Sequence, residues 1–467
     1  MYTSSADTIV ALATPPGYGG IGVVRLSGPS AAAIASKLFS TTPSSPQTPV
    51  PFQSHKLRHG WIVSGGTPVD EVMAVLMQAP HSYTGEDVVE ISAHGGPVLL
   101  AEIVSLCVAQ GARLAQPGEF TFRAFLSGRM DLAKAEAVAD LIASKTSRAA
   151  QAALEQLKGA VSEKVQAWRT QLLTLLASLE VSLDYAEEDI RFVTPEETRA
   201  QVNSLVTALY ALEQTAAKGR LLREGLRAAF IGRPNTGKSS LLNALLEKDR
   251  ALVTDIPGTT RDVIEETIDC GGLPVVIIDT AGLRAHTLDP IEKMGQERTL
   301  QCITSCDVVL WVVDASEPLI DGDRHVLSLL EQQNVLEKTL LIANKTDKGI
   351  ACKEELLSQN KTPHPPVFLS AATRDGIGSL EATLLAYAGM APQVSSEQLS
   401  VTLRHQEALS RAGKELHATI AALTRGDTEE VLAFHLREAL NHLGEITGET
   451  TTDEILDIIF SKFCVGK

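Results

Sequence analysis

The nine residues from Gly232 to Ser240, GRPNTGKSS, constrain the fold of this chain more than any other stretch. They match the pattern G-x-x-x-x-G-K-[ST] and lie between a strand pattern, LRAAFI, and a helical pattern, SLLNALL. This order places backbone N–H groups at a helix N-terminus, where they can face phosphates. Lys238 is expected to reach the β and γ phosphates, and Ser239 to bind magnesium. The stretch therefore predicts a phosphate-binding loop.

Three more segments follow, each at the end of an apolar strand pattern. VVIIDTAG ends with Asp279 in the position of a magnesium-site aspartate and with Gly282 able to donate its N–H to a γ-phosphate. LLIANKTD contains N-K-x-D, and the Asp347 carboxylate can accept hydrogen bonds from both N1–H and the exocyclic amine of guanine. FLSAATRDG is expected to lie against the base. Together the four segments predict a Ras-like guanine-nucleotide domain.

The threonine-rich loop TDIPGTTRD is the predicted switch segment, in which Thr260, or alternatively Thr259, closes on magnesium. The residues predicted to contact GTP are Asn235, Thr236, Gly237, Lys238, Ser239, Ser240, Thr254, Asp255, Ile256, Pro257, Gly258, Thr259, Thr260, Asp279, Thr280, Ala281, Gly282, Asn344, Lys345, Asp347, Ser370, Ala371 and Ala372.

Leu283 departs from the Ras pattern. There a glutamine follows Asp-x-x-Gly and orients the attacking water, whereas here DTAG is followed by leucine. Either the chain cleaves its nucleotide poorly, or another group does the work of the glutamine.

A chain of 467 residues should hold two to four domains, at roughly 100 to 200 residues each. Short apolar runs separated by turns predict a sheet-rich α+β domain over 1–118, in which GYGGIG is a turn between strands and not a dinucleotide fingerprint, because VVRLS follows it instead of a helix. Apolar residues spaced by three and four from Leu154 to Leu179 predict one long helix, and TPEE at 194–197 predicts the cap of the next. The expected architecture is a multidomain α/β chain with a helical bundle in two pieces, 119–220 and 390–467, and the nucleotide domain inserted at 221–389.

Composition limits the function classes. The net charge of −16 argues against a surface that embraces nucleic acid throughout, although a local basic patch or a partner could supply the contact. Six scattered cysteines favour reduced thiols in a cytoplasmic protein. The longest apolar runs, such as VVLWVV, fall far short of the roughly 20 residues that span a bilayer.

The full set of motifs resembles the MnmE (TrmE) family of tRNA-modification GTPases. The likeness rests on ATPPGYGGIGVVRLSG, YTGEDVVEISAHGGP, QPGEFTFRAFLSGRMDLAKAEAVADLI, the nucleotide motifs, LGEITGE and the terminal FCVGK. It implies that hydrolysis depends on potassium and on two GTPase domains meeting across their switch segments. Glu292, or alternatively Glu297, would orient the attacking water. The implied potassium ligands are Asn235, Thr254, Ile256 and Thr259.

The resemblance also implies the overall activity. With the flavin-dependent partner MnmG (GidA), the protein would install an aminomethyl or carboxymethylaminomethyl group on C5 of the wobble uridine of certain tRNAs. The carbon would come from a 5-formyl- or 5,10-methylene-tetrahydrofolate in the first domain, which would also form a homodimer and, with MnmG, a heterotetramer. The implied folate residues are Arg25, Glu90, Arg129 and Lys467.

Two alternatives remain open at this stage. Taken as residues alone, Arg25, Glu90, Arg129 and Lys467 favour ordinary structural roles, as surface side chains or, for Glu90, as a strand-end carboxylate. Cys464, beside the implied folate site, could serve as a nucleophile or a thiol ligand. The chain could also be a regulatory switch of the Era-like type, but that hypothesis gives no reason for the folate motifs or for FCVGK.

Overall fold

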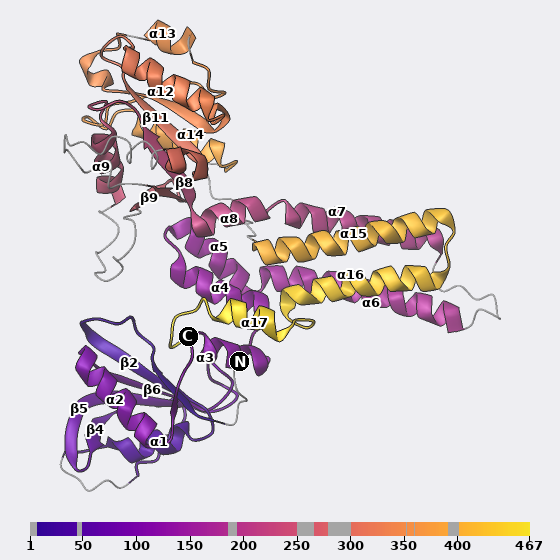
Figure 1. The fold of residues 1–467 in the computed structure, drawn as a ribbon. Coiled ribbons are helices and arrows are strands. Elements are labelled where there is room, and N and C mark those ends of the chain that lie inside the picture. The colour runs from indigo at the N-terminus through magenta and orange to yellow at the C-terminus, as the bar shows by residue number, and fades with distance from the viewer. Residues whose placement is uncertain are drawn as a thin grey trace. The chain divides into compact units, whose positions relative to one another are not determined.

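The computed structural model describes residues 7–43, 49–184, 194–249, 266–278, 300–351, 353–358, 360–390 and 401–467 (Figure 1). The chain divides into two compact units. The first comprises Met1–Ala139, Glu155–Tyr210 and Glu407–Lys467, and the second comprises Asp140–Leu154 and Ala211–Gln406. The four-part division expected from the sequence stays a prediction.

The first unit contains a seven-stranded sheet in the order β3-β4-β5-β6-β2-β1-β7. Neighbouring strands are antiparallel except β1 and β7, which are parallel. One face packs on helices α1 (Ala31–Leu38) and α2 (Pro97–Ala109) through a buried aliphatic core. The strands are β1 (Ile9–Leu12), β2 (Gly19–Ser27), β3 (Phe39–Ser40), β4 (Arg58–Ser64), β5 (Thr67–Met77), β6 (Val88–Gly95) and β7 (Arg113–Leu114).

GYGGIG was predicted as a turn between strands, but of its residues only Gly17 and Tyr18 lie between β1 and β2. Its last four residues, Gly19 to Gly22, already belong to β2 and pair with β6. Gly22 lies against Leu100 of α2 so closely that a Cβ at this position would overlap the leucine side chain. Gly22 therefore serves sheet packing, and the segment continues as a strand and not as a helix.

Helices make up the rest of the first unit. The prediction of one long helix was wrong, because α5 ends at Lys158 and α6 begins at Ala160. Gly159 between them has φ +106°, a conformation that interrupts a helix but costs glycine little. The helices with residues in this unit are α3 (Glu119–Leu126), α4 (Leu132–Ala143), α5 (Ser147–Lys158), α6 (Ala160–Asp184), α7 (Pro195–Glu213), α15 (Leu403–Arg425), α16 (Glu429–Thr447) and α17 (Asp453–Phe460).

The predicted cap of α7 is confirmed. The Glu197 backbone N–H donates to Thr194 Oγ1 at 3.2 Å, and the Thr194 N–H donates to the Glu197 carboxylate at 2.9 Å, which completes a capping box. Helices α6 and α16, far apart in the sequence, pack along each other (Figure 1).

The second unit is built on a six-stranded sheet in the order β13-β12-β11-β8-β10-β9. All pairs are parallel except β9 with β10. Every residue of β11 and β12 is buried, as expected for parallel strands covered on both faces. The strands are β8 (Leu226–Ile231), β9 (Glu266–Cys270), β10 (Leu273–Ile277), β11 (Val308–Asp314), β12 (Thr339–Asn344) and β13 (Val367–Phe368).

Helices cover both faces of this sheet. Helices α9 and α14 pack on one face, together with α8, and α12 and α13 pack on the other. The helices are α8 (Ala216–Glu224), α9 (Lys238–Asp249), α12 (Asp321–Gln332), α13 (Lys353–Ser358) and α14 (Ile377–Tyr387). The loops after β8, β12 and β13 all leave from the carboxyl ends of parallel strands, where ligands bind in open α/β sheets.

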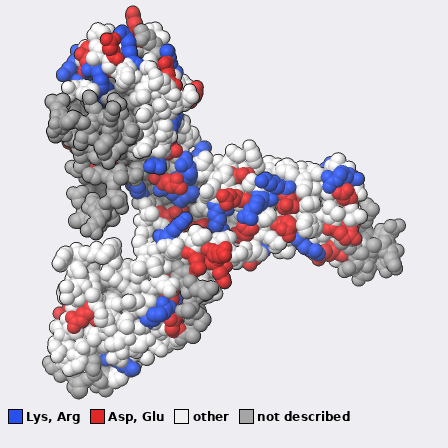
Figure 2. All heavy atoms as spheres, in the orientation of Figure 1, with Lys and Arg blue, Asp and Glu red and all other residues white. Residues whose placement is uncertain are grey.

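Charges of both signs are interspersed over the helices α6, α7, α15 and α16 on the face drawn in Figure 2. That face of the bundle shows no broad area of basic side chains alone. Among the described residues, no helix is both long and apolar enough to cross a membrane.

Candidate functional site

The phosphate-binding loop lies between β8 and α9, as the sequence predicted. Gly232 has φ +151° and passes so close to the backbone of β11 that a Cβ would overlap the Val312 carbonyl oxygen. Gly237 has φ +93°, and a Cβ there would overlap the Asn344 side-chain nitrogen. Both glycines of the motif are thus required by close approach of neighbouring groups as well as by backbone conformation.

Lys238, the first residue of α9, is held by the loop itself. Its Nζ donates to the carbonyl oxygens of Gly232 at 2.7 Å and Arg233 at 2.8 Å. An ammonium group has three donors, so one N–H is left for a phosphate oxygen. Burial, and next the charge of Arg233, lowers the pKa of Lys238. An anion bound here would reverse that effect, which makes the site receptive to phosphate.

The predicted guanine-reading loop is hydrogen-bonded to the phosphate loop. Asn344 Nδ2 donates to the Thr236 carbonyl at 2.9 Å, while Asn344 Oδ1 accepts from the Ala371 N–H at 3.0 Å. Lys345 Nζ donates to the Asn235 carbonyl at 2.6 Å. The predicted phosphate-binding and guanine-reading loops are therefore joined directly by hydrogen bonds.

Asp347 is also oriented by a neighbour. Its Oδ1 accepts from Ser370 Oγ at 2.6 Å, so the loops after β12 and β13 meet at the carboxylate. Ala371 is buried beside them, whereas Ala372 is exposed. A carboxylate fixed on one oxygen is well suited to select a planar base with two adjacent donors.

Two supporting residues were missed by the sequence analysis. Asp314 at the end of β11 binds Lys345 Nζ at 2.6 Å. Burial opposes the ionisation of Asp314, but hydrogen bonds from Lys345 and Ser316 outweigh it and lower the pKa of the carboxyl group. Asp314 could have been noticed, because VVLWVVD ends in aspartate just as VVIID does.

Arg233, a variable position of the motif, is the second missed residue. Its guanidinium donates to Asp323 Oδ2 at 3.1 Å and pairs with Glu317. Both carboxylates lie after β11, about 85 to 90 positions along the chain, and no local pattern predicts such a pairing. The arginine of the phosphate loop is thus engaged by protein carboxylates.

Several predicted residues fall outside the described part of the chain. They are Thr254, Asp255, Ile256, Pro257, Gly258, Thr259, Thr260, Asp279, Thr280, Ala281, Gly282, Leu283, Glu292 and Glu297.

The first unit brings together three of the four predicted folate residues. Arg25 in β2 and Glu90 in β6 are cross-strand partners, and Arg25 Nε donates to Glu90 Oε1 at 2.9 Å. Arg25 Nη1 also donates to the Gly466 carbonyl at 3.1 Å. The Lys467 Nζ lies 6.0 Å from the centre of the Tyr83 ring, and the Arg25 guanidinium lies 5.2 Å from the same ring.

Tyr83 is the member of this cluster that the sequence analysis missed. Its hydroxyl is hydrogen-bonded to Thr121 Oγ1 at 2.9 Å, which fixes the ring under the two cations. Burial, and next the charge of Arg25, lowers the pKa of Lys467, with Glu90 opposing the change. An anionic ligand would raise that pKa again.

Arg129 and Cys464 lie near the cluster in different ways. Arg129 Nε donates to the carbonyl of Ser82, the residue before Tyr83, at 3.2 Å. The Cys464 carbonyl accepts from the Gly118 and Lys467 N–H groups, both at 3.3 Å, and its thiol side is exposed. The Cys464 backbone thus holds this segment in place, and a chemical role of its thiol stays a prediction.

A pocket of about 620 Å³ lies beside the terminal residues. Its walls come from β1, from α2, from the loop at Pro16 and Gly17 and from Val465, and they are mostly apolar. This volume is in the range of roughly 300 to 1,000 Å³ that small-molecule sites occupy. Val465 joins the pocket to Gly466 and Lys467 of the charged cluster.

A second charge cluster fixes the helix beneath this site. Glu119, which opens α3, accepts from Arg113 at 2.6 Å and from Arg123 at 3.0 Å, and both arginines also bind Asp7 at 2.6 Å. Glu119 and Arg123 are almost fully buried. Glu119 is followed in α3 by Phe120 and Thr121. The Phe120 ring lies 5.7 Å from the Arg25 guanidinium, and Thr121 is the residue that binds the Tyr83 hydroxyl.

Comparison with known proteins places the whole chain in the family that its sequence motifs resemble. A family model described as the GTP-binding protein TrmE N-terminus matches residues 8–129, and one described as the MnmE helical domain matches residues 132–464. Proteins named tRNA modification GTPase MnmE from Symbiobacterium thermophilum and Carboxydothermus hydrogenoformans are each 44% identical to the chain, over 465 and 468 residues. In both cases the match covers 99% of this chain and 99% of the relative. With both family models matched and relatives this similar from end to end, the chain belongs to the MnmE family of tRNA modification GTPases.

Proposed function

We propose that this protein hydrolyses GTP with a bound potassium ion in the place of an arginine finger. The observation that carries the proposal is the anchoring of Asn235: Lys345 holds its carbonyl, its φ is +67°, and its side chain is exposed at the rim of the phosphate loop. An amide oxygen in this position suits a hard cation. Arg233 is engaged by Asp323 and Glu317, so the loop's own arginine does not serve the phosphates.

The remaining parts of the proposed reaction follow the family. Ser239 and Thr260 would bind magnesium, and Thr254, Ile256 and Thr259 would complete the potassium site with Asn235. Potassium supplies positive charge to the transferring phosphoryl group. Glu292 would orient the attacking water, since Leu283 cannot. Dimerisation of the nucleotide domains would bring the switch segments together.

The proposed biological reaction is modification of tRNA wobble uridine at C5, carried out with the flavoprotein MnmG. The one-carbon unit would come from a tetrahydrofolate derivative held by Arg25, Glu90, Arg129 and Lys467. The charged cluster suits a charged or polar group of a folate, and the 620 Å³ apolar pocket beside it suits an aromatic part of the same molecule. Homodimerisation through the first 118 residues, a heterotetramer with MnmG and the four-part domain division belong to this proposal.

The potassium proposal predicts a salt-dependent rate. GTP hydrolysis by the full-length protein should be roughly tenfold or more faster in potassium chloride than in sodium chloride at equal ionic strength. Asn235→Ala should remove the difference, and Glu292→Ala should be slow in both salts. Asn243→Ala is the matched control, because Asn243 is an exposed residue of α9 outside the loop and should leave the potassium response intact. Equal wild-type rates in the two salts would favour a switch that needs a separate activator.

The folate proposal predicts a large effect of Gly466→Ala. Gly466 has φ +97°, and a Cβ there would overlap the Leu12 carbonyl oxygen. The segment of Gly466 and Lys467 must then shift. This shift moves the Lys467 side chain away from Tyr83 and the Gly466 carbonyl away from Arg25. Losing one charge-assisted contact of about 1.5 kcal/mol or more should weaken binding of 5-formyltetrahydrofolate at least about tenfold in titration calorimetry.

The control for that experiment is Gly426→Ala. Gly426 also has a positive φ, +74°, but a Cβ there meets nothing within 4 Å and the residue follows α15. Folate affinity should not change. If Gly466→Ala binds 5-formyltetrahydrofolate with an unchanged dissociation constant, then Gly466 and Lys467 do not belong to the folate site.

A further inference from the structure

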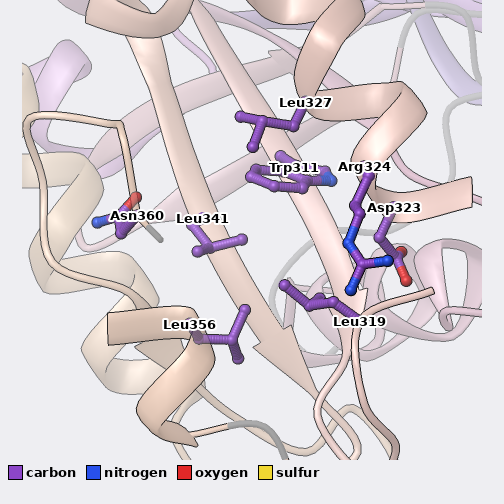
Figure 3. Close-up of a pocket in the computed structure, with 8 residues that line it drawn as sticks. All are labelled: Trp311, Leu319, Asp323, Arg324, Leu327, Leu341, Leu356 and Asn360. Atoms are coloured by element: carbon purple, nitrogen blue, oxygen red, sulfur yellow. The ribbon is translucent and has the colours of Figure 1, made fainter. Parts of the chain in front are cut away.

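A small cavity in the second unit lies between β11, β12 and the start of α12. Its volume is about 10 Å³, and its walls include Trp311, Asp323, Arg324, Leu341 and Leu356. A space of roughly this size holds a single water molecule. Figure 3 shows the indole nitrogen of Trp311 turned toward the side of the cavity that carries Arg324 and Asp323.

Two of the residues that line this cavity each carry a buried polar atom without a hydrogen-bond partner in the described part of the chain. Trp311 Nε1 and Asp323 Oδ1 have no hydrogen-bond partner among the described residues, and the two residues are 3% and 2% exposed. Buried donors and acceptors in folded proteins almost always have a partner, either protein or ordered water. Here one atom is a donor and the other an acceptor, so a single molecule could serve both.

We propose that an internal water is bound here, accepting a hydrogen bond from Trp311 Nε1–H and donating one to Asp323 Oδ1. Water suits the site better than a cation. Arg233 already neutralises the Asp323 carboxylate, and the Arg324 side chain forms part of the wall. A further positive charge would face two guanidinium groups in a small apolar space.

The water would act on nucleotide binding through Arg233. The other oxygen of Asp323 accepts from Arg233 Nε at 3.1 Å and from the Ile320 N–H at 3.2 Å. The Arg233 carbonyl in turn accepts from Lys238 Nζ at 2.8 Å and from Thr236 Oγ1 at 3.1 Å. A carboxylate held on both oxygens keeps Arg233, and with it the carbonyl that orients Lys238, in one position. Trp311 and Asp323 are thus positioning residues for the phosphate loop.

The direct test is a crystal structure of the full-length protein with GDP and magnesium. It should show a water within about 3 Å of both Trp311 Nε1 and Asp323 Oδ1. A direct contact between the two side chains, or a site without density, would overturn the proposal, and this outcome is independent of potassium and folate.

The functional test is a double-mutant cycle on GTP hydrolysis. Trp311→Phe keeps the aromatic ring but removes the donor, and should raise KM for GTP about fivefold, with kcat within about twofold, as expected for one hydrogen bond that supports ground-state binding. Asp323→Asn should have a larger effect, and the double variant should be no worse than Asp323→Asn alone, because both act through the same water.

Leu327→Met is the matched control, since Leu327 lines the cavity without a polar group and its substitution should leave KM unchanged. Effects of Trp311→Phe and Asp323→Asn that simply add, or a KM that moves equally in Leu327→Met, would show that packing and not the water supports the loop.

Discussion

Asp347→Asn should lower the affinity for GTP roughly 10²- to 10⁴-fold, because a site built to pair with particular donors rejects a mismatched partner strongly. The asparagine amide would place a donor against the exocyclic amine of guanine, where Asp347 offers an acceptor. Xanthine carries a carbonyl in place of that amine, so the variant should gain affinity for xanthosine triphosphate. Displacement of a fluorescent nucleotide by each triphosphate measures both changes.

Asp375→Asn is the control for this exchange of base preference. Asp375 lies in the same loop as Ser370 but is exposed, and its side chain pairs with Thr373. It should bind GTP like the wild type. If Asp347→Asn kept its preference for GTP, the base would have to be read by a different group.

Glu119→Gln should destabilise the first unit by about 3 kcal/mol or more, because removing one partner of a buried ion pair leaves the others without compensation. Arg113 and Arg123 would lose one of the two carboxylates that they share, and Arg123 is buried. Urea unfolding can be followed by the fluorescence of Trp61 in β4, in a background with the other two tryptophans, Trp168 and Trp311, replaced by phenylalanine.

The matched control makes the same substitution at an exposed position of the same unit, Glu71 in β5. Glu71 pairs with His59, and both side chains are about half exposed, so Glu71→Gln should change stability by less than about 0.5 kcal/mol. Equal losses for the two variants would mean that burial does not decide the strength of the Glu119 cluster.

The effect of Glu119→Gln on stability should also depend on pH. Burial opposes the ionisation of Glu119, but hydrogen bonds from Arg113, the Gln116 N–H and Arg123 outweigh it, so the pKa of the carboxyl group in the folded protein lies below its ordinary value. Its contribution is complete above the unfolded pKa of about 4.3 and is lost as the pH falls through the lower folded value. The stability difference between the wild type and Glu119→Gln should therefore shrink between pH 6 and pH 3. A difference that grew on acidification would contradict the assignment.

The features that could be predicted from the sequence are those formed by residues that are close together in the chain. The phosphate loop and the N-K-x-D loop were predictable because adjacent residues carry both the backbone conformation and the chemistry. Arg233 and Asp323 were not, since their pairing depends on how β11 and α12 meet β8. The apolar spacing that runs from Leu154 through to Leu179 hid the break at Gly159, because packing periodicity continues across one residue with a positive φ.

The charged cluster of the first unit, by contrast, could not be predicted from any local sequence pattern. Arg25 and Glu90 are brought together by strand pairing, and Gly466 and Lys467 join them from the far part of the chain. No spacing rule connects these positions, and only the family resemblance indicated them before the structure was known. Tyr83, whose ring lies near both cations, opens the motif YTGEDVVEISAHGGP, but nothing in that motif singled it out.

The hydrogen bond from Arg25 to Gly466 joins residues 441 positions apart. At a translation rate of roughly 5 to 20 residues per second, the sheet that carries Arg25 and Glu90 is synthesised about 20 to 90 seconds before the tail that completes the cluster. Throughout that interval the nascent chain can form the sheet, and later the nucleotide domain, while Tyr83 still lacks its second cation. A chain without Gly466 and Lys467 would keep the phosphate loop but would lack the complete cluster. The charged cluster of the first unit can therefore form only after the whole nucleotide domain has been synthesised.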